Sequence, residues 1–318
     1  MSIFRDFFVK EKPVFTGITR GIGGFGFGGG GGGAGGGGQQ ATGGNQEAII
    51  PGNGYVYHTF TSTGPGTFTV TSGFLTSVDV FMVGGGGRGI TGGGGAGAII
   101  YKTNEPVSAQ AYTVSIGAGG LPFPAPFNGP AGPYPVGEGG NSTAFGYTAA
   151  GGGHGGVHNQ NGYPGDPGGS GGAGAPRNGG GVGGAGTGSG DPYPGSGPLV
   201  SPNNGWGNDG GAAHVGNPGG YGGGGGGAGG AGSNSASGPG GAGLAYPDFA
   251  GPLIGVPSLP GTYAVGGPKN GSQGVPAGTY PTAQLLNNSG NGGGHNTSGQ
   301  PEPTYNGSSG IVIIRYSG

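Results

Sequence analysis

Glycine is the feature that most constrains this chain, because it supplies 99 of the 318 residues and gathers into runs between residues 84 and 243. Inside the runs, residues other than glycine often stand three apart, as Ser170, Ala173 and Pro176 do. The same spacing separates Val182 from Ala185, His154 from Val157, Ala228 from Ala231, and Pro239 from Ala242. A repeat of three fits neither an α-helix nor a β-strand, but it is the repeat of a polyproline-II-type helix.

A helix of this type makes no hydrogen bonds within itself, so it needs neighbours that supply backbone donors and acceptors. Glycine is required wherever a neighbour crowds the helix, and the exceptions at a period of three are expected to face outward. Val182 and Ala185 should then share one face. The alternative is a disordered linker, which glycine-rich composition without a period favours. The period therefore predicts packed polyglycine-II helices.

Composition limits what else the chain contains. Hydrophobic residues are 31% and charged residues 6% of the chain, so the apolar core must be small and backbone hydrogen bonds must carry much of the stability. A net charge of −2 gives no reason to expect nucleic acid as a partner. Cysteine is absent, and no run reaches the roughly 20 apolar residues of a membrane-spanning helix. We expect no membrane insertion, and the charged first 20 residues do not fit a signal peptide.

Several stretches rich in β-branched and aromatic residues predict strands. They are residues 55–60, 66–70, 76–83, 97–102 and 112–116, a hairpin over 142–151, and a last strand at 311–316. In that last strand Ile311, Ile313 and Arg315 share one face, and Val312, Ile314 and Tyr316 share the other. We predict a mainly β fold with almost no α-helix: a small antiparallel β-sandwich with the polyglycine-II bundle inserted before the final strand.

The N-terminus differs from the rest of the chain in being both charged and aromatic. We predict a docking segment at residues 1–20, a glycine-rich tether at 21–48 and the body at 49–318. Aromatic and basic side chains are typical interface anchors, and those expected to dock are Phe4, Arg5, Phe7, Phe8, Lys10, Lys12 and Phe15. The alternative is a frayed terminus.

Loops between the glycine runs combine proline with aromatic residues. Proline stiffens a loop and lowers the entropy lost on binding, and aromatic rings suit the face of a sugar or a protein loop. The predicted receptor-binding residues are Phe123, Phe127, Tyr134, Tyr193, Trp206, Tyr246, Phe249, Tyr263 and Tyr280. The alternative, favoured for any one of these residues, is a satellite core that covers the sheet ends or the glycine layer.

Motifs for catalysis or metal binding are weak. Matches to GxGxxG are frequent by chance at this glycine content, and none opens a helix of a dinucleotide-binding unit. His154 and His158 stand four apart, but no helix forms around Gly155 and Gly156, so we predict no metal site there or at His214 and His295. The loop acids Glu138, Asp166, Asp191, Asp209 and Asp248 offer no selected pair for glycoside hydrolysis. We expect no cofactor and no enzyme activity, with polysaccharide depolymerase activity as an open alternative.

Two stretches of the sequence and its overall alternation of glycine runs and loops resemble known families. The opening IFRDFFVKEKPVFTG…RGIGGFGFG resembles the start of structural proteins of marine cyanophages related to the T-even phages. The ordered series FMVGGGG, GGGGAGAIIY, YTVSIGAGG, GGNSTAFG and SGIVIIRY, over residues 55–318, resembles the glycine-rich domain of phage tail-fibre proteins. The alternation of runs and loops also resembles the distal tail-fibre adhesins of T-even-type phages, in which packed polyglycine helices display receptor-binding loops. This chain departs from them in carrying its own docking segment.

These resemblances imply a structural virion protein: a short phage fibre or adhesin that is made in the host cytoplasm. The implied partners are other virion proteins, bound through residues 1–20, and a host surface glycan or outer-membrane protein; a homotrimer is possible. One alternative is a purely architectural virion component, such as a capsid decoration or baseplate protein. The other is an ice-binding protein, because small outward residues on polyglycine helices also resemble the glycine-rich antifreeze proteins of snow fleas.

Overall fold

The computed structural model describes residues 39–121, 137–156, 165–175, 205–213, 222–235, 238–259, 261–268, 287–294 and 306–318. All of these residues except Gly318 belong to one compact unit, Gln39–Ser317. Strands dominate it, and among the described residues the helical element is a short 3-10 helix, η1 (Pro247–Phe249). The mainly β fold class is therefore confirmed. The docking segment at residues 1–20 lies outside the described residues.

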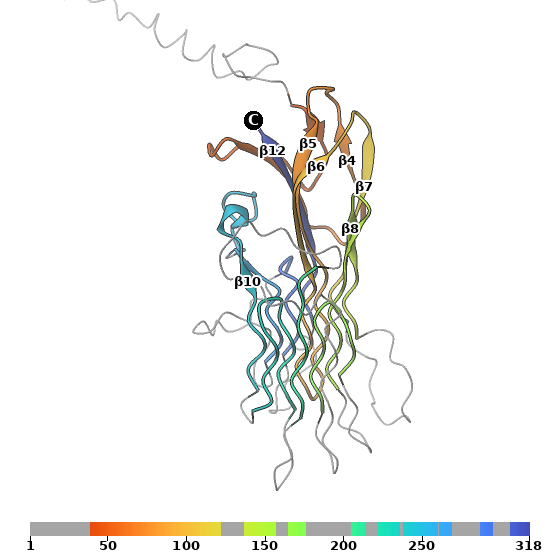
Figure 1. The fold of residues 1–318 in the computed structure, drawn as a ribbon, viewed down its shortest axis with the longest axis vertical. Coiled ribbons are helices and arrows are strands. Elements are labelled where there is room, and N and C mark those ends of the chain that lie inside the picture. Colours follow the sequence, from red (N-terminus) through yellow and green to blue (C-terminus); the bar gives the residue numbers. More distant parts are fainter. Residues whose placement is uncertain are drawn as a thin grey trace, which may run out of the picture. The chain divides into compact units, whose positions relative to one another are not determined.

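Two five-stranded sheets and a small hairpin-like pair make up the strand region (Figure 1). The outer sheet has the order β1 (Ala41–Thr42), β4 (Gly64–Val70), β7 (Ala111–Ile116), β8 (Ser142–Ala144) and β9 (Tyr147–Ala149). The central sheet has the order β2 (Gln46–Ile49), β3 (Tyr55–Phe60), β12 (Ile311–Ser317), β5 (Ser77–Val83) and β6 (Ile99–Pro106). β10 (Leu244–Ala245) pairs with β11 (Thr262–Tyr263). All these pairings are antiparallel.

Each strand predicted from the sequence is present; β3 has the predicted ends, and the others are shifted by a few residues. The predicted tether needs correction, because β1 and most of β2 lie within residues 21–48. Ala41 of β1 is fully buried and pairs with Val70 of β4, so this part of the chain closes the edge of the outer sheet. A two-residue strand is too short for an alternating pattern to reveal it.

The last strand, β12, is the middle strand of the central sheet and pairs with β3 on one side and β5 on the other. Val312, Ile314 and Tyr316 face a core shared with the outer sheet. Ile311 and Ile313 face a second core shared with the β10–β11 lobe, which we define as residues 244–259 and 261–263. The predicted return of the C-terminal strand and its two faces are confirmed, and the second face packs against a third layer that the sequence did not predict.

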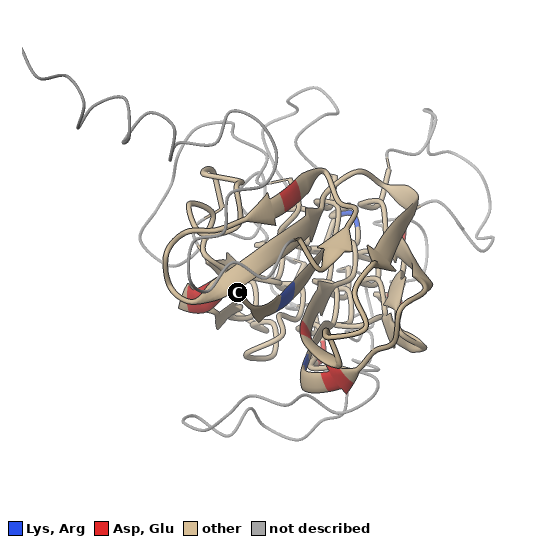
Figure 2. Cartoon of the chain, turned by 90° about the horizontal axis from the view of Figure 1, so that it is seen from above, with Lys and Arg blue, Asp and Glu red and all other residues tan. Residues whose placement is uncertain are grey.

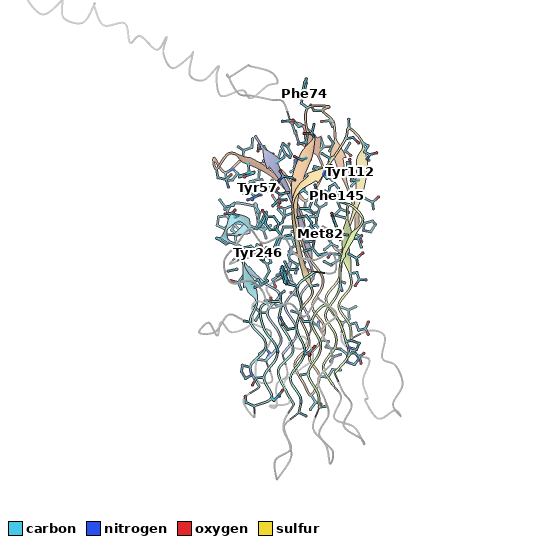
Figure 3. The ribbon with its side chains drawn as sticks, viewed as in Figure 1. Tyr57, Phe74, Met82, Tyr112, Phe145 and Tyr246 are labelled. Carbon is cyan, nitrogen blue, oxygen red and sulfur yellow. The ribbon has the colours of Figure 1, made fainter. Side chains whose placement is uncertain are left out.

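Side chains gather around the strands, and the glycine-rich segments carry few of them (Figure 3). Charged residues are also few and scattered over the described body when it is seen from above (Figure 2). None of the helical segments in the described part of the chain has the length and apolar character needed to span a membrane.

The described glycine-rich segments form what we call the glycine array, in which extended chains lie side by side and exchange backbone hydrogen bonds. Residues 93–98 show its rule most clearly. Their first and fourth N–H groups donate to residues 223 and 226, their second and fifth to 293 and 290, and their third and sixth to 153 and 150. Three successive donors thus reach three different neighbours, and the pattern repeats after three residues.

The structure of the described glycine runs does not support polyglycine-II helices as such. It shows instead an array of extended segments joined by backbone hydrogen bonds at distances of about 2.6 to 3.4 Å. The array explains the glycine content directly. A Cβ added at Gly94 would stand 2.2 Å from the carbonyl oxygen of Gly87, and one at Gly152 would stand 2.0 Å from that of Gly95.

The expected outward positions are wrong for part of the array. Ser170, Ala173 and His154 are buried, as is Ala228, whereas Ala231, Pro239 and Ala242 are exposed. Segment 165–175 has neighbours on more than one side: Ser170 and Ala173 donate to residues 96 and 93, and Gly171 and Gly174 donate to residues 208 and 211. A segment inside the array has no outward face, so a small side chain there fills a gap. Pro176, Val182, Ala185 and Val157 lie outside the described residues.

The array makes Gly94→Ala a sensitive test of backbone packing. We expect it to lower the free energy of unfolding by about 1–3 kcal/mol, the range typical of overpacking, because the new Cβ meets backbone that has no room to move. Gly73→Ala is the matched control, since an added Cβ there meets nothing within 4 Å. In thermal unfolding, the midpoint of Gly94→Ala should lie below that of the native chain, and the midpoint of Gly73→Ala should be unchanged. Equal midpoints for the two variants would contradict a tightly packed array.

Candidate functional site

Arg315 is a buried cation in the middle of the central sheet. It lies on β12, and its Cα is paired with that of Asp79 on β5. The Nε atom donates to Oδ2 of Asp79 at 3.0 Å, with side-chain exposures of 6% for Arg315 and 17% for Asp79. Because neighbouring strands place this cation and this carboxylate at matched register, the sheet itself positions the ion pair.

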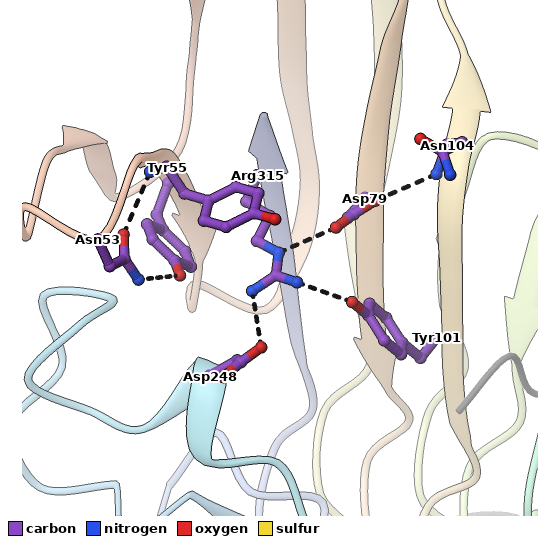
Figure 4. A network of polar contacts seen from close by, with 8 residues as sticks. Asn53, Tyr55, Asp79, Tyr101, Asn104, Asp248 and Arg315 are labelled. Carbon is purple, nitrogen blue, oxygen red and sulfur yellow. Dashed lines mark hydrogen bonds and ion pairs between the residues drawn. The ribbon is translucent and has the colours of Figure 1, made fainter. Parts of the chain in front are cut away.

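The remaining contacts of Arg315 come from other elements (Figure 4). Its Nη1 donates to Asp248 of η1 at 3.2 Å, and its Nη2 donates to the hydroxyl of Tyr101 on β6 at 2.9 Å. The guanidinium carbon lies 4.3 Å from the ring centre of Tyr55 and 4.8 Å from that of Phe249. The guanidinium therefore joins the β10–β11 lobe to the central sheet through charge, hydrogen bonds and cation–π contacts.

This environment keeps Arg315 charged. Burial opposes the charge, but hydrogen bonds with Tyr57, Asp79 and Asp248, together with the Tyr101 hydroxyl, outweigh it and raise the pKa of Arg315 above its ordinary value. Burial raises the pKa of Tyr101 to about 12, although Arg315 acts in the opposite direction. Tyr101 thus stays a neutral partner of the guanidinium at physiological pH.

A pocket of about 330 Å³ opens beside this ion pair. It is lined by Tyr55, Ser77, Val78, Asp79, Tyr101, Thr103, Asn104, Arg315, Tyr316 and Ser317. The β5–β6 ladder is irregular at this point, because Val78 pairs with Glu105 while Val80 pairs with Lys102, leaving Thr103 and Asn104 opposite Asp79. Asn104 has a φ of 56° and donates its backbone N–H to Oδ1 of Asp79 at 3.1 Å. Bulges of this kind commonly redirect side chains at binding sites.

Four of the predicted receptor-binding residues are described, and all four are buried. Trp206 is 7% exposed, Tyr246 3%, Phe249 1% and Tyr263 0%, and they pack in the core between the central sheet and the β10–β11 lobe. Tyr263 also donates its hydroxyl to the carbonyl of Phe249 at 2.6 Å. These rings have no free face for a receptor, so for these four the satellite core is what the structure shows.

The other predicted residues lie outside the described residues. They are Phe123, Phe127, Tyr134, Tyr193 and Tyr280 of the loops, and Phe4, Arg5, Phe7, Phe8, Lys10, Lys12 and Phe15 of the docking segment. Their roles stay predictions. The Arg315 site was not predicted as a site, although the sequence carried a signal for it: Arg315 and Asp79 are charges inside two strongly apolar strands of a chain that is only 6% charged.

His154 forms a second polar contact, inside the glycine array. Its Nε2 lies 2.8 Å from Oδ2 of Asp166, and its Nδ1 lies 3.0 Å from the carbonyl oxygen of Gly155. Burial lowers the pKa of His154, but the bond to Asp166, its charge, the Gly155 carbonyl and the charge of Glu138 outweigh burial, so the pKa is raised overall. His158, His214 and His295 fall outside the described part of the chain.

Two of the loop acids have cationic or histidine partners in the structure: Asp248 bonds Arg315, and Asp166 bonds His154. No group of three or more His, Asp or Glu side chains within the described ranges could hold a metal ion. The arrangement at Arg315 can bind a small polar molecule, since it combines a pocket, a fixed ion pair and aromatic rings. It presents no activated nucleophile.

Comparison with known proteins gives one family. A family model described as a glycine-rich domain matches residues 61–317, from directly after β3 to the last residue of β12. A search of curated proteins finds no match. The match covers well over half of the chain, and it spans both the strands and the glycine array.

The two carboxylates at Arg315 should differ in their contribution to stability. Asp79→Asn removes a mostly buried charge beside the guanidinium, and we expect the free energy of unfolding to fall by about 3 kcal/mol. Asp248→Asn is the control: its side chain is 69% exposed, so the loss should stay below about 1 kcal/mol. Urea unfolding measures both, and equal losses would mean that burial does not make Asp79 the more important partner of Arg315.

The His154–Asp166 contact predicts a pH dependence. Because the folded pKa of His154 is raised above the unfolded value near 6.5, its contribution is full below that value and is lost as the pH rises through the folded pKa. The difference in unfolding midpoint between the native chain and Asp166→Asn should therefore be largest below about pH 6.5 and shrink as the pH is raised above it. His58, whose pKa burial lowers, has the opposite sign but is common to both proteins and cancels. A constant difference would refute the linkage.

Proposed function

Since the chain belongs to the glycine-rich domain family, we propose that it is a structural virion protein, a short phage fibre or adhesin. In this proposal, residues 1–20 dock the chain to other virion proteins, and loops between the glycine runs bind a host surface glycan or outer-membrane protein. It needs no cofactor and performs no catalysis. Its place is the surface of the virion, on the tail, baseplate or capsid, and a homotrimer is compatible with it.

The connectivity of the glycine array is the observation that carries this proposal. At several places in the array, the described residues before and after an intervening stretch of the chain lie side by side. The backbone hydrogen bonds that join the two ends are Asp166 to His154, Gly211 to Gly224, Gly292 to Val265 and Ser308 to Asn291, and a Cβ on Gly120 would meet the carbonyl of Gly137 at 2.2 Å. The array's own hydrogen bonds thus hold the described ends of these stretches side by side.

The sequences of these loops suit recognition. Residues 122–136 contain Phe123, Phe127 and Tyr134 among prolines, and residues 269–286 contain Tyr280. Stiff, aromatic loops on a rigid scaffold are a common way to build a binding surface, because little entropy is lost when they bind. The resemblance to distal phage adhesins supports the same assignment.

The architectural alternative keeps one specific observation in its favour. Four of the nine aromatic residues expected at a receptor surface, Trp206 and Tyr246 among them, are used in the core. A capsid decoration or baseplate protein would need such a core but would need no receptor-binding loops. A measurement of binding to host cells therefore distinguishes an adhesin from a purely architectural component.

If the chain is an adhesin, the purified full-length protein should bind marine cyanobacterial cells saturably and block adsorption of a phage that carries it. Phe123→Ser, Phe127→Ser and Tyr134→Ser together should weaken cell binding at least about tenfold, as the loss of aromatic anchors does at other interfaces. Phe74→Ser is the control. Phe74 is an aromatic residue that is 93% exposed, but it lies between β4 and β5 and not in a loop between glycine runs, so its loss should leave cell binding unchanged. Absence of saturable binding across host strains would favour the architectural function.

A further inference from the structure

The pocket beside Arg315 has a backbone built differently from the rest of the sheet. In a regular strand, successive side chains point to opposite faces, yet both Thr103 and Asn104 line this pocket. The irregular β5–β6 pairing brings this about, and Asn104 adopts a positive φ, which asparagine tolerates better than most residues other than glycine. Backbone of this kind persists where the surrounding structure maintains it, and it is common at binding sites.

The polar groups of the pocket are suited to hydrogen-bond the hydroxyl groups of a ligand. Ser77, Thr103 and Ser317 offer hydroxyls that donate and accept, Asn104 offers an amide, and Asp79 offers acceptors. Tyr55 and Tyr101 add aromatic rings with polar ends. Figure 4 shows Tyr55, Tyr101 and Asp79 grouped around the guanidinium of Arg315, with Asn104 on the far side of Asp79. A ligand with many hydroxyls and one apolar face would satisfy both kinds of group.

The charges around Arg315 disfavour a further anion. Arg315 is the cation, and it is already paired with Asp79 and Asp248, so these three groups together carry one excess negative charge. An acidic ligand would have to displace a carboxylate from the guanidinium, whereas a neutral ligand would not. The ion pair also holds the β10–β11 lobe, but that structural role does not account for a pocket and a bulge beside it.

We infer that this pocket binds one neutral saccharide unit. Its volume of about 330 Å³ suits a small ligand, at the low end of the range for binding pockets. The inference deepens the proposed adhesin function and rests on it for the source of the sugar, which would be a host surface glycan. It adds a contact on the central sheet to those of the loops.

The test is saturation-transfer NMR on the full-length protein, with methyl glucoside, galactoside and mannoside as neutral probes and methyl glucuronide as the acidic one. At least one neutral glycoside should bind with a Kd in the millimolar range, about what a single sugar in one small pocket achieves, and the glucuronide should bind more weakly. No transfer to any neutral glycoside, or tighter binding of the glucuronide, would overturn the inference.

Variants then locate the binding. Ser77→Trp fills the pocket from the first residue of β5 and should weaken the bound glycoside at least about tenfold. Thr113→Trp is the control, since Thr113 is an exposed residue of β7 in the outer sheet and should change nothing. Thr103→Val removes one hydroxyl with little change of shape and should weaken binding about threefold or more. It tests the same site if Ser77→Trp does not fold. Unchanged affinity in the folded pocket variants would refute the site.

The glycoside experiment and the cell-binding experiment can fail independently, so they distinguish the pocket inference from the adhesin proposal. Glycoside binding that Ser77→Trp abolishes, without binding of the full chain to host cells, supports the pocket and removes the adhesin. Cell binding that depends on Phe123, Phe127 and Tyr134, without glycoside binding, supports the adhesin and removes the pocket.

Discussion

The backbone hydrogen bond between neighbouring glycine segments is the interaction on which the rest of this structure depends. Successive N–H groups in residues 93–98 reach three different neighbours, so one segment is held from several sides at once. Such close approach leaves no room for a Cβ, and a chain that satisfies its polar groups this way needs little apolar surface. The low hydrophobic content of the sequence and its high glycine content are therefore two consequences of one packing rule.

The array is continuous with the sheets rather than attached to them. β5 runs directly into the segment that starts at Gly84, and β12 follows the segment that ends at Gly310, whose N–H donates to Gly117 after β7. The two apolar cores lie on the two faces of the central sheet, one shared with the outer sheet and one with the β10–β11 lobe. The array contributes small side chains to these cores, such as Ala96 and Ala228 in the second one.

Arg315 links the parts of the strand region. From the middle strand it contacts β5, β6 and η1, so the lobe is positioned by a charge network as well as by its aromatic core. The pocket beside it uses the same residues from a different direction. One cluster thus serves stability and, in our proposals, recognition, and the loops between array segments add a second, separate surface.

By itself, the sequence determined the mainly β class, the strands, the two faces of β12 and the existence of a glycine-rich packed region, because these follow from local periodicity and from residue size. Only the tertiary structure decided which small residues are buried, since Ser170 and Ala173 have the same spacing as outward positions but lie between neighbouring segments. It also decided that Tyr246 and Phe249 pack inward and that Asp79, Tyr101 and Arg315 meet. These contacts join residues far apart in the chain, and no local pattern encodes which distant segments become neighbours.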